Sequence, residues 1–203
     1  MRKIIAAEYL SLDGVAEDPG PAGDFRHRGW TMPYWNDELA KYQSDLLFGS
    51  DALLLGRVTY EEFVASWPSR SGDPFTDRMN SLPKFVASRT LRQPLKWNST
   101  LLKGDVAEQV RKLKQQAGEN ILIYGSGELV NTLMQRDLID VYRIMLYPLA
   151  LGSGRRLFPG GGDKATLALT SAQTTSSGVV VLTYHPAEKH PERSGSEERR
   201  QPR

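Results

Sequence analysis

Short apolar runs recur along the first 150 residues, and three of them contain almost no polar residue. These runs are IIAA at 4–7, ALLLG at 52–56 and ILIYG at 121–125. A short apolar run without alternation is typical of a strand buried on both faces, as in a sheet covered by helices. The pattern along the whole chain predicts strands at 3–10, 52–55, 84–87, 99–102, 120–124, 140–146, 165–174 and 178–184.

Apolar residues with helical spacing lie between several of these strands. The three clearest stripes are Leu39, Tyr42, Leu46 and Leu47, then Val106, Val110 and Leu113, then Leu129, Val130, Leu133 and Met134. Asp105 stands where it would cap the second of these helices. Strands that alternate with helices predict an α/β fold with a mostly parallel central sheet and helices on both faces. No helix separates the last two strands, and TTSSG at 174–178 is typical of a hairpin turn, so antiparallel strands are expected at the C-terminal end of the sheet.

Two segments show neither pattern. Residues 17–33 are rich in glycine, proline and aromatic residues, and an irregular loop of this length in a compact domain is usually functional or mobile. Residues 186–203 have almost no apolar side chain to bury and are predicted to form a disordered polar tail. The chain is therefore expected to form one domain over residues 1–185.

Composition narrows the possible functions. The 203-residue chain has a formal net charge of +2, so no broad basic surface for nucleic acid is expected. It contains no cysteine, which excludes thiolate catalysis and cysteine-ligated metals and suits a reducing cytoplasm. The three histidines are scattered and no HExxH or PCxxC motif occurs, so no metal site is predicted. No apolar stretch approaches the ~18 residues that a membrane span needs.

The first junction with candidate chemistry is GRVT at 56–59, which follows three leucines. Two interpretations fit it. Thr59 and Glu62 have the spacing of a capping box, which would make the stretch an ordinary helix start with a surface arginine. Alternatively, Gly56 and Arg57 hold an anion at the start of the helix. Taken alone, the stretch favours the ordinary helix start.

A second junction, Gly125-Ser126-Gly127, connects an apolar strand to a helix. It is either a plain glycine turn capped by Ser126 or a cradle of backbone N–H groups for a phosphate. The match to the dinucleotide fingerprint is poor, because Tyr147 lies in the region where an acid for the ribose is expected. A standard NAD-binding Rossmann domain is therefore disfavoured.

The third junction places Ser88, Arg89 and Thr90 after a short apolar strand. These side chains fit a phosphate, and they fit a solvated turn equally well. The carboxyl ends of parallel strands lie at one edge of a sheet, where ligands bind, so all three turns are expected together there. Two arginines without an acid for a ribose hydroxyl favour NADPH over NADH.

The first strand ends in SLDG at 11–14. Asp13 is either a substrate-binding carboxylate or a turn aspartate, and the turn is at least as common. Hydride transfer needs little from protein side chains beyond positioning and exclusion of water, so the small number of candidate acids and bases does not count against a reductase.

In this order, the motifs resemble the dihydrofolate-reductase-like family. They are most similar to the stand-alone proteins related to the C-terminal reductase domain of bacterial riboflavin biosynthesis. The resemblance is carried by SLDGVA at 11–16, LLLGRVTYEEF at 53–63, KFVASRT at 84–90, the long segment 121–158 and the closing strand pair. It covers roughly residues 2–184, and it implies a three-layer sandwich that binds NADPH across its strand ends.

The resemblance also implies roles for single residues and for the assembly. It assigns adenosine-side phosphates to Gly56, Arg57, Thr59, Ser88, Arg89 and Thr90, the pyrophosphate to Gly125, Ser126 and Gly127 with Glu128 and Leu129 beside them, and the nicotinamide to Leu12, Asp13 and Gly14. Asp13 is expected to orient a small-molecule substrate or to relay a proton. A homodimer is expected, with residues 147–158 near its contact.

Two departures from the family pattern bear on the substrate. Val15 stands where riboflavin-pathway reductases often carry lysine, which disfavours a phosphoribityl substrate. Asp37 and Asp45 lie in the helix that corresponds to the one holding the substrate-binding acid of true dihydrofolate reductases, but the pattern selects neither. We expect a cytoplasmic NADPH-dependent reductase of a small heterocyclic or carbonyl substrate, with the riboflavin-pathway reaction second. The alternative from another class is a non-catalytic NADPH-binding sensor or scaffold module.

Overall fold

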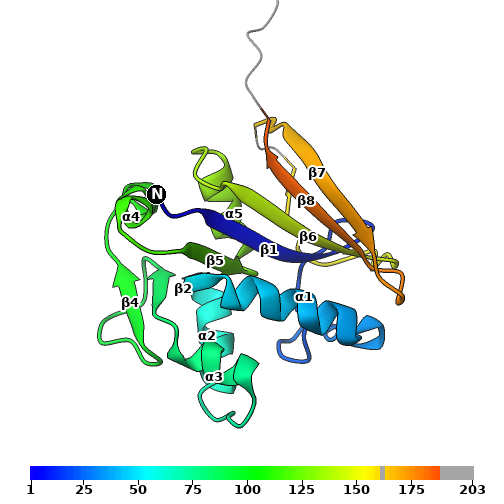
Figure 1. The fold of residues 1–203 in the computed structure, drawn as a ribbon, viewed down its shortest axis with the longest axis horizontal. Coiled ribbons are helices and arrows are strands. Elements are labelled where there is room, and N and C mark those ends of the chain that lie inside the picture. Colours follow the sequence, from blue (N-terminus) through cyan, green and yellow to red (C-terminus); the bar gives the residue numbers. More distant parts are fainter. Residues whose placement is uncertain (161–162, 188–203) are drawn as a thin grey trace, which may run out of the picture.

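The computed structural model describes residues 1–160 and 163–187, and its elements follow the apolar pattern (Figure 1). The helices are α1 (Asp37–Phe48), α2 (Arg57–Ser66), α3 (Pro74–Ser81), α4 (Val106–Gln115) and α5 (Gly127–Met134), and a 3₁₀ helix spans Met32–Tyr34. The strands are β1 (Ile4–Ser11), β2 (Ser50–Gly56), β3 (Lys84–Ala87), β4 (Ser99–Leu102), β5 (Asn120–Tyr124), β6 (Val141–Tyr147), β7 (Leu167–Thr174) and β8 (Val180–Pro186). All eight predicted strands are present.

One eight-stranded sheet contains all of these strands, in the order β4-β3-β2-β5-β1-β6-β8-β7. The six strands from β4 to β6 in this order run parallel to their neighbours, whereas β8 is antiparallel to β6 and β7 is antiparallel to β8. The turn between β7 and β8 is closed by a hydrogen bond from the N–H of Thr175 to the carbonyl of Val179. The mixed sheet with an antiparallel C-terminal end is therefore confirmed.

Helices cover the sheet on both faces and create two cores. Helices α4 and α5 pack on one face, where their buried residues include Val110 and Val130. Helices α1, α2 and α3 pack on the other face, where their buried residues include Leu39, Tyr60 and Met79. Figure 1 shows α1, α2 and α3 on one side of the sheet and α4 and α5 on the other. Because alternate residues of each central strand enter opposite cores, the strands need apolar side chains at nearly every position.

The sequence pattern did not predict α3 or the 3₁₀ helix. Only Thr76 and Met79 of α3 are buried, so its eight residues show no apolar stripe. Its start was nevertheless marked in the sequence, because Asp73 accepts a hydrogen bond from the N–H of Thr76 and Pro74 occupies the first helical position. The cap predicted at Asp105 is confirmed, since its carboxylate accepts from the N–H of Glu108.

The C-terminal boundary of the domain differs slightly from the expectation. Pro186 belongs to β8, and the N–H of Ala187 donates to the carbonyl of Thr166. The rest of the predicted polar tail, 188–203, lies outside the described residues. Within the described ranges, no helix is long and apolar enough to cross a membrane.

One acidic residue, Glu8, is buried in the core beside α4 and α5. Its neighbours two positions away, Ala6 and Leu10, both point into that core, so Glu8 points there too. Only 2% of its surface is exposed, and its Oε1 atom has no hydrogen-bond partner. Burial raises the pKa of the Glu8 carboxyl well above its ordinary value, so the folded protein favours the protonated acid.

Replacing this acid is expected to stabilise the protein more at high pH than at low pH. In the wild type, an unfolded Glu8 ionises above its ordinary pKa while the folded carboxyl stays protonated, so stability falls as pH rises between the two values. The loss is about 1.4 kcal/mol per pH unit over that interval. Urea unfolding of the wild type and of Glu8→Gln at pH 5 and pH 8 measures the free energy of unfolding of each, and Glu119→Gln, at an exposed position, is the control. An equal difference between Glu8→Gln and wild type at both pH values contradicts the prediction.

Candidate functional site

Four loops meet at the carboxyl-end edge of the adjacent parallel strands β3, β2, β5 and β1. In register, Gly56 at the end of β2 pairs with Ala87 at the end of β3, and Tyr124 at the end of β5 pairs with Ala7 of β1. The loops that follow contain SRT, GRVT, GSG and SLDG, in that spatial order. The structure thus brings the predicted turns to one edge, while their roles in binding are still predictions.

Two hydrogen bonds join the GRVT and GSG turns directly. The backbone N–H of Gly56 donates to Oγ of Ser126 at 2.9 Å, and the N–H of Ser126 donates to Oγ1 of Thr59 at 3.0 Å. Gly125 has a φ of +53°, and a Cβ there would lie 3.2 Å from the Thr59 hydroxyl. Glycine at this position therefore serves both the left-handed backbone conformation and the close approach of the two turns.

The capping-box interpretation of Thr59 is wrong. Helix α2 begins at Arg57 with Gly56 as its N-cap, so Thr59 is the third helical residue and its hydroxyl accepts from Ser126. Ser126 stands at the N-cap of α5, but its side chain does not cap that helix either. Both hydroxyls bridge the two turns instead, because the two helix starts are neighbours in space. The spacing of residues within one turn does not indicate that their hydroxyls will bond to another turn.

Helices α2 and α5 consequently differ from the other α-helices of the described part of the chain. The starts of α1, α3 and α4 are capped by the side chains of Asn36, Asp73 and Asp105, whereas those of α2 and α5 have no side-chain cap. The first N–H groups of a helix have no acceptor within the helix and carry the positive end of its dipole. Two uncapped helix starts side by side fit negatively charged oxygen atoms.

The predicted arginines lie at the surface near these helix starts. Arg57, the first residue of α2, is 46% exposed and pairs with Glu61 at 2.8 Å. Arg89 is exposed beyond β3, where the hydroxyl of Ser88 accepts from the N–H of Thr90 at 3.1 Å and shapes the turn. An exposed ion pair contributes about 1 kcal/mol or less, so Arg57 can exchange Glu61 for a phosphate at little cost.

The two residues after the GSG turn have different environments. Glu128 is exposed in the first turn of α5, whereas the side chain of Leu129 is buried in the core. For Leu129, only the backbone N–H is available to a ligand at the helix start. In the SLDG turn, Leu12 is 62% exposed and Gly14 has a φ of +80°.

Asp13 is confirmed as a turn aspartate. Its carboxylate accepts from the hydroxyl of Ser11 at 2.7 Å and from the N–H groups of Leu151 at 3.0 Å and Gly152 at 2.9 Å. These bonds, that from Ser11 foremost, lower the pKa of Asp13 to about 2. The carboxyl is therefore ionised at neutral pH and does not fit a proton donor, although it still fits a residue that orients a substrate.

Val15 occupies a closed position behind this turn. Its side chain is fully buried, and a Cβ on Gly154 would lie 2.7 Å from its Cγ1 atom. Backbone bonds from Ala16 to Arg155 and from Leu157 to Gly14 hold the two segments together. The valine thus packs against the 150–157 loop, in place of a basic side chain that reaches toward a ligand.

The 17–33 segment is a folded loop at the same end of the sheet. The indole N–H of Trp30 donates to the carbonyl of Glu17 at 2.8 Å, and the N–H of Gly29 donates to that of Asp18 at 3.0 Å. A cavity of about 420 Å³ lies between this loop and α2, lined by Glu17, Asp18, Gly23, Asp24, Phe25, Val58, Glu62 and Arg155. Burial, and then Asp18, raise the pKa of Glu62.

The sequence did not identify Glu62 as a site residue. It also did not identify the tyrosines near the ends of three neighbouring strands, which are Tyr9, Tyr124 and Tyr147. A signal for the tyrosines was present, since each interrupts an apolar strand close to its carboxyl end. The acids of α1 are not substrate ligands inside the fold, because Asp37 is exposed and Asp45 pairs with Lys41 at the surface.

Known proteins resemble the chain over nearly its whole length. Residues 2–181 match the family described as the RibD C-terminal domain. The uncharacterized protein YyaP of Bacillus subtilis (strain 168) is 31% identical over 189 residues, which are 91% of this chain and 95% of that protein.

Two solved structures show the same fold. A candidate riboflavin biosynthesis protein from Shewanella sp. PV-4 aligns with a TM-score of 0.73 at 24% identity, covering 92% of this chain and 99% of its own. A pyrimidine reductase-like protein from Corynebacterium diphtheriae aligns with a TM-score of 0.68 at 12% identity, covering 93% of each chain. The predicted dihydrofolate-reductase-like sandwich is confirmed, and the chain belongs to the RibD C-terminal domain family.

Proposed function

We propose that this protein is an NADPH-dependent reductase of a small heterocyclic or carbonyl substrate. The observation that carries the proposal is the pair of uncapped helix starts of α2 and α5, joined through Ser126 at the ligand-binding edge of the sheet. Family membership supports a reductase. In a chain of this family, two neighbouring sets of free N–H groups are well suited to the pyrophosphate of a dinucleotide.

The residues at the edge fit NADPH in a definite way. The N–H groups of Gly127 and Glu128 would receive the pyrophosphate, and the start of α2 would receive an adjacent phosphate oxygen. Arg57 and Arg89 would supply positive charge for the 2′-phosphate. Bound NADPH supplies a hydride from C4 of its nicotinamide. The side chains around the SLDG turn then have to orient the substrate and exclude water, which the ionised, hydrogen-bonded Asp13 supports by holding the 151–152 loop in place.

The reduction of 5-amino-6-(5-phosphoribosylamino)uracil, as in riboflavin biosynthesis, is the second candidate. The buried Val15 disfavours it, because no basic side chain at that position reaches a ribityl phosphate. The alternative from another class is a non-catalytic NADPH sensor, which fits an ionised Asp13 that is held by the 151–152 loop. A cytoplasmic location fits this proposal, because NADPH is available there.

The test of the function is a fluorescence titration with NADPH followed by NADPH oxidation assays. The assays use a panel of pterins, pyrimidines, quinones and the phosphoribosylamino-uracil. Oxidation with one class of compound supports the reductase. NADPH binding without oxidation on any of them favours the sensor, and no binding at micromolar NADPH contradicts both.

Removing either arginine is expected to weaken NADPH binding about tenfold while NADH binding changes little. A charge-assisted bond to a phosphate contributes about 1.5–3 kcal/mol, and the exposure of both side chains reduces this. Titrations of Arg57→Ala and Arg89→Ala with both nucleotides measure the effect, and Arg111→Ala on the exposed surface of α4 is the matched control. If NADPH and NADH lose affinity equally, the assignment of these arginines to the 2′-phosphate is contradicted.

We also propose a homodimer in which the edge strand β7 takes part. Its sequence, LALTSAQT, has no charge, most of its side chains are exposed, and Leu169 is 52% exposed. An uncharged exposed edge strand pairs readily with another chain. Equilibrium sedimentation is expected to give the mass of two chains for wild type and for Phe48→Lys, a surface control, but of one chain for Leu169→Lys. A monomeric wild type would contradict the proposed dimer. If the Leu169→Lys variant is still a dimer, the contact lies near residues 147–158 instead of β7.

A further inference from the structure

The GSG turn and the SLDG turn are neighbours at the edge of the sheet, but they stand at different levels. Strand β1 pairs with β5 as far as Ala7 and Tyr124, where β5 ends. Strand β1 continues to Ser11, so its end stands roughly 13 Å beyond the level of Tyr124 at about 3.3 Å per residue. The ladder between β1 and β5 therefore does not set the distance between the two turns.

Leu157 bridges this step between the turns. Its N–H donates to the carbonyl of Gly14 in the SLDG turn at 3.0 Å. Its side chain lies over the GSG turn, since a Cβ on Gly127 would stand 3.5 Å from its Cδ1 atom. Only 1% of the surface of Leu157 is exposed. One buried residue thus contacts both turns.

Asn131 of α5 holds the other side of Leu157. Its Nδ2 atom donates to the carbonyl of Leu157 and, at 2.8 Å, to the carbonyl of Gly127, the first residue of α5. A side-chain amide nitrogen has two N–H groups, so both of its donors are used. The backbone of Leu157 is therefore bonded to the SLDG turn through its N–H and to α5 through its carbonyl.

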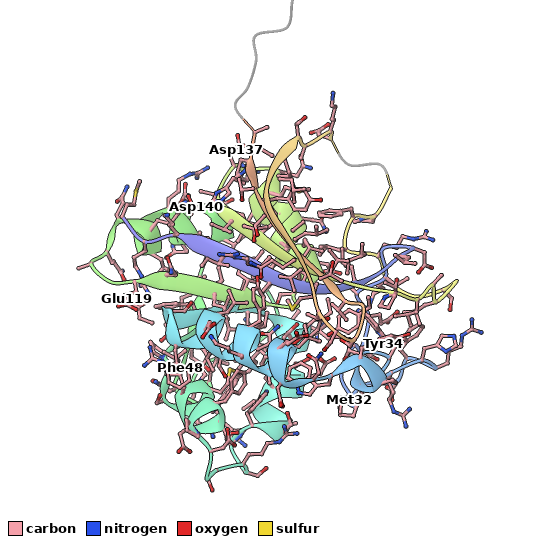
Figure 2. The ribbon with its side chains drawn as sticks, turned by 45° about the vertical axis from the view of Figure 1, so that its right-hand side comes forward. Met32, Tyr34, Phe48, Glu119, Asp137 and Asp140 are labelled. Carbon is pink, nitrogen blue, oxygen red and sulfur yellow. The ribbon has the colours of Figure 1, made fainter. Side chains whose placement is uncertain are left out.

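Asn131 lies one turn inside α5, behind the helix start that faces the candidate site. Helix α5 begins at the GSG turn and leads away from it. Figure 2 shows Asp137 and Asp140, which follow this helix in the chain, at the upper left of the molecule and Tyr34 at the lower right. Asn131 consequently acts on a ligand at the helix start through the backbone groups that it holds.

Each of the two turns also has bonds of its own that do not involve Asn131. Ser126 joins the GSG turn to α2, and Asp13 joins the SLDG turn to the 151–152 loop. Asn131 and Leu157 therefore control the spacing of the turns, while other residues control the shape of each turn. A ligand that contacts two parts of a protein binds more tightly when they are already held at the right distance, because ordering them on binding costs affinity.

We propose that Asn131 is a positioning residue for the dinucleotide. Through Leu157, it sets the distance between the turn that receives the pyrophosphate and the turn beside the nicotinamide. The inference rests on the proposed function, because it concerns the same cofactor site. Loss of the two amide donors releases the SLDG turn and leaves the phosphate end intact. It therefore weakens a ligand that reaches both turns and spares one that reaches the phosphate end alone.

The test is calorimetric titration of the full chain with NADPH and with 2′-phospho-ADP-ribose, which lacks the nicotinamide ring. Asn131→Leu keeps a side chain of similar size and removes both donors. We expect this variant to bind NADPH about tenfold more weakly than the wild type does, and the fragment within about twofold of it. Thr132→Val is the matched control, because it removes a hydroxyl that bonds to the carbonyl of Glu128 in the same helix. We expect it to bind both ligands as the wild type does.

A second variant, Asn131→Ala, is expected to show the same contrast and replaces Asn131→Leu if that variant does not fold. Equal losses for NADPH and the fragment would mean that Asn131 supports the helix and not the spacing. Unchanged NADPH affinity would mean that the bridge is not needed. Either result overturns this inference and leaves the reductase proposal intact, whereas a wild type that binds neither ligand contradicts both.

Discussion

The candidate site depends on two hydrogen bonds through which Ser126 joins the starts of helices α2 and α5. Its hydroxyl accepts from Gly56 at the end of β2, and its N–H donates to Thr59 in α2. Because β2 and β5 are adjacent and parallel, these bonds fix the starts of α2 and α5 side by side at one edge. The same bonds use the hydroxyls that would otherwise cap the helices, so the first N–H groups of both helices stay available to an anion.

The three-layer architecture gives the two ends of the central strands different tasks. Along most of their length, both faces are apolar and face helices, which makes the sheet a rigid support. At the carboxyl ends, the chain replaces apolar residues with glycine, hydroxyl and aromatic side chains. The candidate site lies at this end, and Tyr124, the last residue of β5, is followed immediately by Gly125 of the GSG turn.

The acids near this edge differ in their burial and in their hydrogen bonds. Asp13, the acid of the SLDG turn, is ionised and bonded to the loop at 151–152, while Glu8 is buried in the opposite core, where burial raises its pKa. Glu62 is one of four acids, with Glu17, Asp18 and Asp24, that line the cavity between α2 and the 17–33 loop, and burial raises its pKa. The turns at this edge thus present backbone N–H groups, hydroxyls and arginines, while the carboxylates line the cavity beside the 17–33 loop.

The sequence alone determined the strands, three capped or striped helices, the parallel sheet with its antiparallel end and the edge where the motifs collect. Apolar periodicity and the exclusion of knots and long crossings leave few alternatives for such a chain. Helix α3 was not predicted from the sequence, because only two of its residues are buried and it shows no apolar stripe. Only the tertiary structure decided that Thr59 bonds to Ser126 rather than capping α2, that Asp13 closes a loop, and that three tyrosines share one face. Each of these depends on contacts between residues far apart in the chain, and local spacing carries no information about such contacts.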